Sequence, residues 1–571
     1  MARIWRLVAA ATAATLLLTG CSEADDPSPT NAQSSSAADA LATIPVQASY
    51  VFYGTPTGEY PFRFSLIDVR RIEGGTVLDY ALTALPFGDV GEGESTFGLD
   101  TADFDFDGEG NAPDISLLDI DGEEIYYPRA EYIGGHCPCT RPYFGGFEIG
   151  ETQLHQVAYP ELPEDLTTVT VNFGNGPLVE DVPVLEEGTV PVAAEPFDFR
   201  APAEPLPSPA STGPFDQPIV AFSGEESQPA KISVNAVLAG EDATTLVWSV
   251  EATGDGDGIG DFTIGSPMTD PVTLYTVGMY RSFSANGPGL RPSGDEDAPV
   301  MRTWVSTMLS KPGVTQAGIE SADYRRCLCT EYSTYALDLD SAGDARVFTT
   351  KLPALPEGTE TVDVVFPDDA LPALTDVPVT EAVTATDLET TTVTVQTWTD
   401  TDDLVNSATY APEDWPIPVP SVEALSVAEP YVDRLTAEYT LGEVDKSEQQ
   451  SEVELRLDST ISFKADSAKL TAKASTLIET VAEQINADAV PGSIVHIDGY
   501  VADTGTNHSI DQSLSAARAE AVAKALSPLL DVDVTLKAEG HGTDDPIGDN
   551  STEAGRALNR RVEVSFTATT P

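Results

Sequence analysis

The sequence predicts a multidomain chain in which two tandem all-β sandwiches precede a C-terminal α+β domain. Turn-forming Pro, Gly and Asp recur at short intervals before residue 470, and β-branched residues alternate with polar ones in 169–173 and 361–366. After residue 451 the pattern becomes β-α-β-α-β-β, with helical periodicity over Leu470–Ile485 and Leu514–Leu530. This change of periodicity divides the chain into an all-β part and a mixed part.

An internal duplication predicts that the β part holds two copies of one unit. Cys137-Pro138-Cys139-Thr140 returns 190 residues later as Cys327-Leu328-Cys329-Thr330, and Asp181-Val182-Pro183-Val184 returns 195 residues later as Asp376-Val377-Pro378-Val379. Two copies of so long a unit do not stack as a solenoid. Short alternating strands with frequent turn signals instead favour immunoglobulin-like sandwiches.

The first twenty residues are expected to be a targeting segment. Arg3 and Arg6 give a positive start, and the apolar run Leu7–Leu18 is too short to span a bilayer. The small residues before Cys21 resemble a bacterial lipobox, in which the peptide is cut before the cysteine and the new terminus is acylated, with palmitate among the chains. An ordinary secretory signal is the alternative. We expect an exported protein that is anchored in a membrane by lipid at Cys21.

Composition divides the rest of the chain. The Ser-, Ala-, Asp- and Pro-rich stretch after the signal is too polar to bury a core, and two Pro- or Thr-rich acidic stretches separate the larger segments. The expected domains are a lipoprotein signal peptide (1–20), a disordered tether (21–44), β-sandwich repeat 1 (45–190), a linker (191–225), β-sandwich repeat 2 (226–385), a second linker (386–450) and the α+β domain (451–567).

The charge is acidic and unevenly spread. The 571 residues include 93 Asp and Glu but 29 Lys and Arg, which gives a net charge of −64. Residues 451–571 hold 19 of the acidic and 10 of the basic residues, so most of the negative charge lies in the β part. Such a field repels nucleic acid and anionic headgroups. We therefore expect no nucleic-acid partner.

Four further cysteines form two Cys-x-Cys pairs, Cys137 with Cys139 and Cys327 with Cys329. Export favours oxidation, so the first interpretation is a disulfide within each pair, held in a tight turn. Free thiols and a metal site are the alternatives. His136 precedes the first pair, but Arg326 stands at the matching position of the second, and two thiols do not fill a tetrahedral shell.

One acidic loop has the spacing of a calcium loop. Asp103, Asp105 and Asp107 stand at loop positions 1, 3 and 5, Gly108 at position 6 and Asp114 at position 12. Asp114 is shorter than the Glu that usually binds bidentately at that position, and no helices are predicted on either side. A solvated acidic loop is therefore the alternative to a Ca²⁺ site. We expect no other cofactor.

Three ordered motifs stand in the α+β domain: Leu514–Ala519, Gly540–Gly542 followed by Pro546-Ile547, and Gly555–Glu563. Their order and spacing resemble the OmpA-like family, the peptidoglycan-binding domain of outer-membrane protein A and of peptidoglycan-associated lipoprotein. The resemblance covers about one fifth of the chain. It implies an α+β fold that binds peptidoglycan without covalent chemistry.

The resemblance also implies which residues bind. Stem peptides carry diaminopimelate, whose free carboxylate suits a guanidinium and whose ammonium suits an acid. Arg518, expected at the start of the second helix, matches the family arginine that holds the carboxylate, and the helix dipole would add to the attraction. Arg561, in the basic cluster at a strand start, is a second candidate. Packing and a salt bridge at the strand end are the alternative role for Arg561.

The acidic half of this site departs from the family pattern. The family loop Gly-His-Thr-Asp-x-x-Gly corresponds to Gly499–Gly505 here. Aligned from the glycines, the acid position is occupied by Ala502, whereas counting back from Arg518 places Asp503 there. Asp511, at a position where the family has Asn, is another candidate partner for the ammonium. Weaker binding or a different stem residue stays open.

The two ends of the chain together predict a lipid-anchored cell-envelope protein that tethers a membrane to peptidoglycan. The outer face of the plasma membrane is favoured, and an outer membrane stays open. The alternative is a degenerate OmpA-like module in an envelope adaptor or receptor whose acidic β domains bind an unknown protein partner, with calcium. No Gly-x-Ser-x-Gly, His-Glu-x-x-His or phosphate loop is present, so we expect no enzyme.

Overall fold

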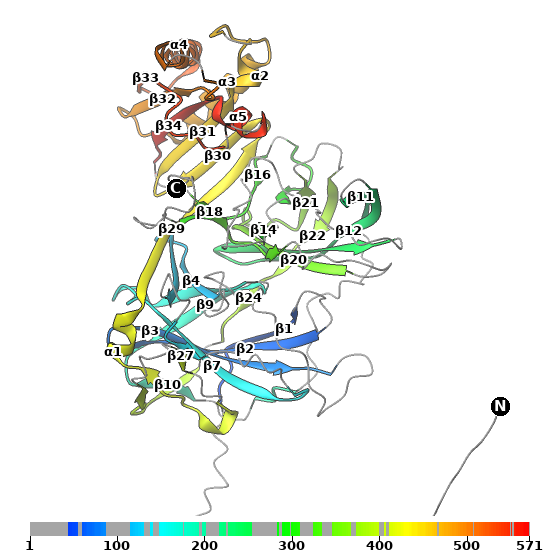
Figure 1. The fold of residues 1–571 in the computed structure, drawn as a ribbon, viewed down its shortest axis with the longest axis vertical. Coiled ribbons are helices and arrows are strands. Elements are labelled where there is room, and N and C mark those ends of the chain that lie inside the picture. Colours follow the sequence, from blue (N-terminus) through cyan, green and yellow to red (C-terminus); the bar gives the residue numbers. More distant parts are fainter. Residues whose placement is uncertain are drawn as a thin grey trace, which may run out of the picture. The chain divides into compact units, whose positions relative to one another are not determined.

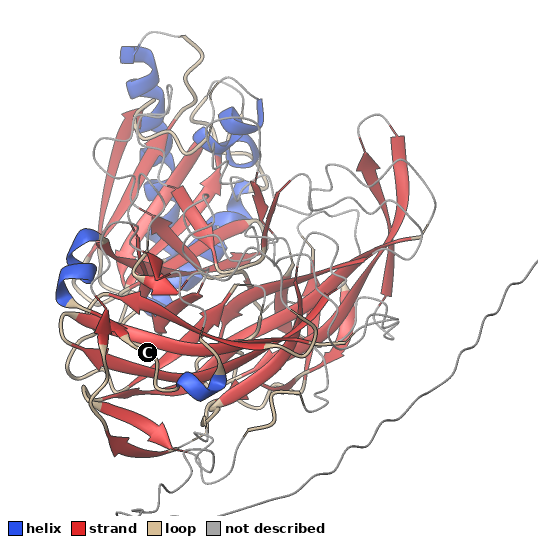
Figure 2. Cartoon of the chain, turned by 60° about the horizontal axis from the view of Figure 1, so that its bottom comes forward, coloured by secondary structure: helices blue, strands red, loops and turns tan. Residues whose placement is uncertain are grey.

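The fold was analysed in a computed structural model of the chain. The structure describes residues 44–54, 60–86, 115–130, 137–140, 148–174, 176–192, 197–200, 216–223, 226–253, 282–284, 288–296, 298–308, 324–333, 345–366, 373–386, 388–398, 405–406, 410–464, 467–505, 508–548, 550 and 553–569. The signal peptide, the tether with Cys21, and the candidate calcium ligands Asp103, Asp105, Asp107 and Asp114 lie outside these residues. Strands make up most of what is described (Figure 2).

The first β unit consists of two sheets that share one core. One antiparallel sheet has the order β1 (Ala48–Gly54), β2 (Tyr60–Ile72), β3 (Gly75–Ala84), β7 (Thr152–Tyr159). The other has the order β5 (Glu124–Ala130), β4 (Ile115–Asp119), β8 (Thr168–Phe173), β9 (Leu178–Leu185). Aromatic side chains from both sheets pack against each other within the core, as Phe64 and Phe173 do with ring centroids 4.2 Å apart.

The second β unit repeats this plan. One sheet has the order β11 (Asp216–Ser223), β12 (Glu226–Ala239), β13 (Ala243–Ala252), β20 (Ala345–Pro353). The other contains β16 (Val300–Met301), β15 (Gly289–Pro292), β21 (Thr361–Val365) and β22 (Leu374–Pro378) in that order. Trp248 of the first sheet and Val364 of the second are both fully buried in the shared core.

Details shared by the two β units support the predicted duplication. Asp181 and Asp376, 195 residues apart, both adopt a left-handed backbone with φ of 59°. The hydroxyl of Thr140 accepts a hydrogen bond from the amide of Gln156 at 2.7 Å. In the second unit the hydroxyl of Thr330, which also follows a Cys-x-Cys pair, accepts one from the amide of Thr349 at 2.8 Å. The same local geometry therefore recurs at the offsets that the sequence gives.

Each Cys-x-Cys pair is closed as a disulfide within itself, as the first interpretation expects. The Cα atoms of Cys137 and Cys139 are 5.2 Å apart, and those of Cys327 and Cys329 are 5.3 Å apart. All four residues are buried. Each bridge therefore fixes a turn that presents a threonine hydroxyl to the neighbouring strand.

The segment expected as the second linker is folded where the structure describes it, so that interpretation is wrong there. Its long strand β29 (Glu429–Leu441) pairs with β5, β16, β17 (Val305–Met308) and β30 (Val444–Gln449). Trp415 and Ile417 are buried. The Thr- and Pro-rich composition indicates an extended backbone, but scattered Trp, Ile and Val side chains suffice to bury it.

Short elements complete the β part. They are β6 (Cys139–Thr140), β10 (Thr189–Val192), β14 (Ser282–Ser284), β18 (Tyr324–Cys327), β19 (Glu331–Ser333), β23 (Thr380–Glu381), β24 (Val383–Thr384), β25 (Glu389–Thr392), β26 (Thr397–Trp398), β27 (Val405–Asn406), η2 (Pro412–Asp414), β28 (Val419–Pro420) and α1 (Val422–Val427). None of the helices in the described part of the chain has both the length and the apolar character that crossing a membrane requires.

The C-terminal module is the α+β part that the periodicity predicts (Figure 1). Its sheet has the order β31, β34, β32, β33, in which β32 and β33 are parallel and the other neighbours antiparallel. Its elements are β31 (Glu452–Asp458), α2 (Ser459–Ser462), α3 (Ala474–Asp488), β32 (Ile494–Tyr500), α4 (His508–Leu526), η3 (Ser527–Leu529), β33 (Thr535–Gly542), α5 (Glu553–Asn559) and β34 (Arg561–Thr567). The helices α3 and α4 cover one face of the sheet and close its core.

The predicted β-α-β-α-β-β order misses one helix in this module. The block from Gly555 to Asn559 forms the short helix α5, and the last strand begins after it at Arg561, within the basic cluster as expected. Glu553 forms ion pairs with both Arg556 and Arg560, at 2.8 Å each, which stabilises this short helix. The segment of α5 contains a glycine and few apolar residues, so its sequence shows no helical periodicity from which the helix could be predicted.

Candidate functional site

The backbone of α4 lies directly against the sheet at one end of the C-terminal module. A Cβ atom on Gly499 would lie 2.3 Å from the carbonyl oxygen of Ser515, and one on Gly540 would lie 2.2 Å from the amide nitrogen of Ala516. Ser515 is fully buried, and its hydroxyl accepts a hydrogen bond from the amide of Gly542 at 2.9 Å. The serine of the Leu-Ser-x-x-Arg motif therefore fastens α4 to β33, and the two glycines make the close approach possible.

Arg518 follows Ser515 by one turn and is 5% exposed. Its Nε donates a hydrogen bond to the carbonyl oxygen of Ser467 at 3.2 Å, and its guanidinium carbon lies 5.3 Å from the centre of the Phe463 ring. The residue does not stand at the start of its helix, because α4 already begins at His508. The predicted contribution of the helix dipole to carboxylate binding at Arg518 is therefore wrong, because the dipole acts within the first turn of a helix. The polar stretch before Leu514 hid this helix start.

Asp511 lies in the first turn of α4, where the helix dipole favours a carboxylate. With Ser515 and Arg518 it has the i, i+4, i+7 spacing of one helix face, and all three are buried. Two of the predicted binding residues therefore share a face of one helix. Of the other two, Asp503 belongs to the loop between β32 and α4, and Arg561 begins β34.

Asp503 is exposed, and its carboxylate serves its own loop. Its Oδ1 accepts a hydrogen bond from the amide of Gly505 at 2.8 Å, while its amide donates to Oδ1 of Asn550 at 3.0 Å. Ala502, the residue that the alignment from the glycines places at the acid position, is 5% exposed and turned inward. Of the two alternatives, Asp503 presents its side chain to solvent and Ala502 does not. An opposed arrangement of Asp503 and Arg518 stays a prediction.

Arg561 is the first residue of β34 and is 3% exposed. Its Nη2 donates to the carbonyl oxygen of Asp545 at 3.0 Å, its Nε bonds to Glu563, and its guanidinium carbon lies 3.8 Å from the centre of the Tyr500 ring. Its Nη1 has no hydrogen-bond acceptor among the residues that the structure describes. A buried donor of this kind is uncommon, and a ligand carboxylate would satisfy it.

Asn559 organises the loop that lies next to this site. It is 1% exposed, and its Oδ1 accepts hydrogen bonds from the amides of Ile547 and Gly548 at 2.7 and 2.8 Å. Its Nδ2 donates to Oδ1 of Asn550 at 2.8 Å, the same atom that accepts from the amide of Asp503. Asn559 therefore has a structural role and connects the loop after β33 to the loop that carries Asp503.

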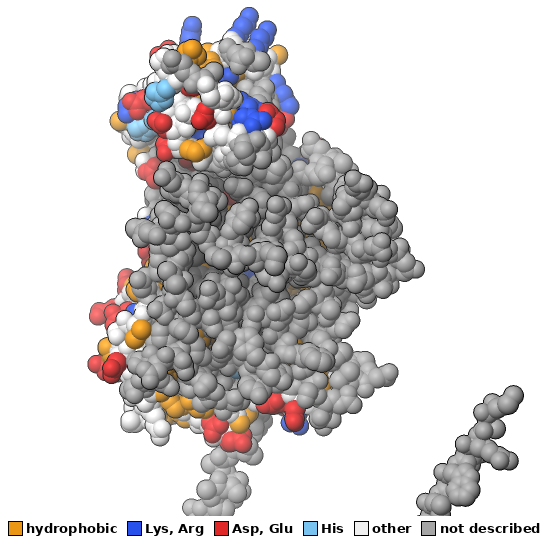
Figure 3. Space-filling view, in the orientation of Figure 1, with side chains coloured by type: hydrophobic (Ala, Val, Ile, Leu, Met, Phe, Trp, Pro, Cys, Tyr) orange, Lys and Arg blue, Asp and Glu red, His pale blue; other side chains and the backbone are white. Residues whose placement is uncertain are grey.

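A group of residues at the ends of β32 and β33 was not predicted from the sequence. The rings of Tyr500 and His541 stack with centroids 5.0 Å apart, and Nε2 of His541 lies 2.8 Å from Oδ1 of Asp498. Burial raises the pKa of Tyr500, so its phenol stays neutral. The alternation of these residues with Gly499 and Gly540 is the signal that could have found them. Basic, acidic and histidine side chains are interspersed on the visible face of this module (Figure 3).

The comparisons with known proteins agree with this fold. The OmpA family model matches residues 462–560. These residues are an OmpA family domain. The predicted resemblance is thereby confirmed for this part of the chain.

Three curated relatives align with the same region. The outer membrane protein Omp38 of Acinetobacter baumannii is 31% identical over 25% of this chain and 39% of its own length. The probable lipoprotein YiaD of Escherichia coli is 34% identical over 20% of this chain and 50% of its own length. The peptidoglycan-binding protein ArfA of Mycobacterium tuberculosis is 36% identical over 18% of this chain and 31% of its own length. The chain therefore spans half or less of each of these relatives.

Proposed function

We propose that this protein is a lipid-anchored component of the cell envelope that binds peptidoglycan non-covalently through its OmpA family domain. The observation that carries the proposal is the buried guanidinium of Arg561, whose Nη1 has no acceptor among the described residues. A protein named for peptidoglycan binding is among the relatives of this domain. The buried donor supplies the chemistry that such binding needs, a cation held ready for a carboxylate.

A second guanidinium belongs to the same end of the domain. Arg561 stands opposite Asp458, the last residue of β31, in the antiparallel register. The segment that follows β31 carries Phe463, on which Arg518 packs. Arg518 and Arg561 therefore both lie near the end of the sheet at which β31 ends and β34 begins. Two fixed guanidinium groups suit the carboxylates of a stem peptide.

The ammonium of diaminopimelate requires an acidic partner. Asp503 is the exposed candidate, and Asp511 is the candidate on the face of α4 that carries Arg518. Rotation of the Asp503 side chain away from the amide of Gly505 would free its carboxylate for a ligand at the cost of one hydrogen bond in an exposed loop. Because the carboxylate of Asp503 must first leave the amide of Gly505, we expect it to bind the ammonium more weakly than an acid that is already free and oriented toward the ligand.

The rest of the chain fits an anchored tether. Acylation at Cys21 would hold the chain in a membrane outside the cytoplasm, for which we favour the outer face of the plasma membrane. The two β units, as immunoglobulin-like sandwiches, would act as spacer or adhesive surface. A Ca²⁺ ion at the loop 103–114 and an unknown protein partner of the acidic units belong to the alternative proposal, an envelope adaptor or receptor.

Sedimentation with diaminopimelate-type peptidoglycan tests the proposal. The full chain should sediment with insoluble peptidoglycan, and free diaminopimelate should release it. Arg518→Ala should abolish sedimentation, whereas Lys524→Ala removes one exposed cation of the same helix and should leave it unchanged. Thermal unfolding of each variant checks that the module is still folded. Equal sedimentation of wild type and Arg518→Ala would refute the site and favour the adaptor role of the β units.

A further inference from the structure

Two glycines dictate where their neighbours on β32 and β33 point. Gly499 and Gly540 face α4 so closely that neither position has room for a side chain. Because successive residues of a strand point to opposite faces, Asp498, Glu539 and His541 must project from the face away from α4. Their side chains are partly exposed, at 20%, 48% and 33%. The same glycines that seat the helix thus create a polar cluster on the other face.

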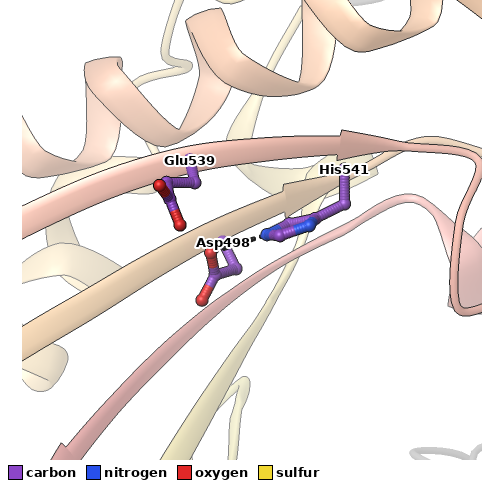
Figure 4. Close-up of side chains that lie close together, drawn as sticks. All are labelled: Asp498, Glu539 and His541. Carbon is purple, nitrogen blue, oxygen red and sulfur yellow. Dashed lines mark hydrogen bonds and ion pairs between the residues drawn. The ribbon is translucent and has the colours of Figure 1, made fainter.

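The three side chains bring one donor atom each into a small volume. A carboxylate oxygen of Asp498, one of Glu539 and a ring nitrogen of His541 all lie within 4.8 Å of one another. Figure 4 shows the three side chains on the side of the strands away from the helix, with the hydrogen bond between Asp498 and His541. Zinc ligands at about 2.0–2.2 Å in a tetrahedron stand about 3.4 Å apart. Small side-chain rotations therefore reach that geometry from the present one.

The strand register makes this arrangement stable. Asp498 lies directly beside Glu539 in the parallel pairing of β32 with β33. His541 is two residues further along β33, on the same face. Its ring stacks on that of Tyr500 with an angle of 19° between the planes, which restricts the rotation of the imidazole. Two ligands therefore come from one rigid strand and the third from its hydrogen-bonded neighbour, which is the kind of support a metal site needs.

The basic residues near the cluster do not neutralise its two carboxylates fully. Glu539 has an ion pair with Lys537 at 3.1 Å, and both side chains are half-exposed, so this pair is weak. Glu563 stands opposite Asp498 in the register with β34 and pairs with Arg561. Asp498 forms a hydrogen bond with His541 itself. A divalent ion would lie between these two side chains in place of that hydrogen bond and would offset the charge of both carboxylates.

We propose that Asp498, Glu539 and His541 bind one divalent transition-metal ion, of the zinc class. One imidazole with two carboxylates suits Zn²⁺ and similar first-row ions, whereas Ca²⁺ and Mg²⁺ prefer sites made entirely of oxygen ligands. Water completes the coordination, since the cluster is open to solvent. None of the three proposed ligands is a residue proposed to bind peptidoglycan, and metal binding is measured without peptidoglycan, so its test does not depend on that function.

Calorimetric titration of the full chain with Zn²⁺ tests the site. Excess Mg²⁺ occupies the acidic surface, and the buffer contains no reductant, so that the Cys-x-Cys pairs stay oxidised. We expect binding of one ion per chain above the Mg²⁺ background, and Co²⁺ should give the intense visible absorption of a low-coordinate site. Binding with the same affinity in His541→Ala, or no one-to-one binding above the background, would overturn the proposal.

Two further variants separate a lost ligand from a lost fold. Asp498→Asn keeps the size of the side chain but weakens one ligand, and we expect at least about tenfold lower affinity. His508→Ala removes an exposed imidazole at the start of α4 and should bind as wild type. Thermal unfolding without metal should be similar for all variants, whereas Zn²⁺ should raise the midpoint for wild type and His508→Ala alone. A midpoint shift that persists in Asp498→Asn and His541→Ala would assign the ion to another part of the chain.

Discussion

The guanidinium carbon of Arg561 lies 3.8 Å from the centre of the Tyr500 ring, so the first residue of β34 rests on the last residue of β32. Both residues are buried. The ring therefore holds the guanidinium in place by cation–π attraction. The ring of Tyr500 also stacks on the ring of His541. Tyr500 thus connects the proposed peptidoglycan site with the proposed metal site.

The planar shape of Arg561 should matter for binding as well as its charge. Arg561→Lys keeps the charge but loses the stack on Tyr500 and the fork that reaches Asp545 and Glu563. We expect about tenfold weaker retention on peptidoglycan, equivalent to about 1.4 kcal/mol. Arg560→Lys is the matched control, because Arg560 forms a more exposed ion pair with Glu553. Equal retention by the two variants would mean that Arg561 only packs the strand end.

Asn559 should stabilise the binding loops from a distance. Asn559→Ala removes four hydrogen bonds of a buried side chain and leaves the amides of Ile547 and Gly548 without their acceptor. We expect the free energy of unfolding to fall by about 2–4 kcal/mol and binding to peptidoglycan to weaken. Urea unfolding and sedimentation measure the two effects.

Asn486→Ala is the control for this prediction. Asn486 accepts hydrogen bonds from the amides of Asp531 and Val532 at 2.7 and 3.2 Å, in the loop before β33. Asn486→Ala should lower the free energy of unfolding. When equal amounts of folded protein are compared, this variant should bind peptidoglycan as well as wild type does. If both variants weaken binding in proportion to their loss of stability, Asn559 has no specific influence on the Asp503 loop.

The parts of the fold that could be predicted are those in which periodicity is strong. Apolar residues at helical spacing identified α3 and most of α4, and the alternating runs identified the strands that bury a core. The duplication was visible because short motifs recur at nearly constant offsets, and Asp181 and Asp376, which begin one such motif in each copy, both adopt a left-handed backbone. These features depend on local sequence, which one chain displays directly.

The parts that could not be predicted depend on pairing between distant strands. Asp498 and Glu539 become neighbours through the parallel register of β32 and β33, and no local pattern encodes that register. Tyr500 and Arg561 meet for the same reason, 61 residues apart in the chain. The fold of residues 429–449 was missed because its sequence is as polar as a linker, although it forms two strands.

A close approach of backbones should make Gly540 irreplaceable. Gly540→Ala would bring a methyl group 2.2 Å from the amide nitrogen of Ala516, which belongs to helix backbone and cannot rotate away. We expect a loss of about 1–3 kcal/mol or more in the free energy of unfolding as α4 is displaced from the sheet. Lys537→Ala, on the same strand but exposed, should change stability by less than about 0.5 kcal/mol. Urea unfolding distinguishes the two, and equal stability would mean that α4 shifts without cost.

The first β unit contains a buried ionic group whose carboxylates outnumber its cation. Arg70 Nη1 lies 2.7 Å from Oδ1 of Asp68 and also pairs with Asp79, which accepts a hydrogen bond from Gln156 at 2.7 Å. Asp68, Arg70 and Asp79 are all about 1% exposed or less. Burial raises the pKa of Asp68 to about 7, although the attraction of Arg70 opposes the rise. Burial likewise raises the pKa of Asp79.

These raised pKa values predict that stability falls as the pH rises. The folded state holds a proton on Asp68 up to about pH 7, whereas the unfolded chain releases it near 3.8, so the contribution is full at low pH and is lost as pH rises through about 7. The loss is at most about 1.4 kcal/mol per pH unit in that window. Asp68→Asn mimics the protonated carboxyl group, so its free energy of unfolding should fall less between about pH 5 and pH 8. Asp181→Asn, an exposed position whose left-handed backbone suits Asn, should keep the wild-type slope, and an unchanged slope in Asp68→Asn would show that Asp68 is ionised in the folded protein.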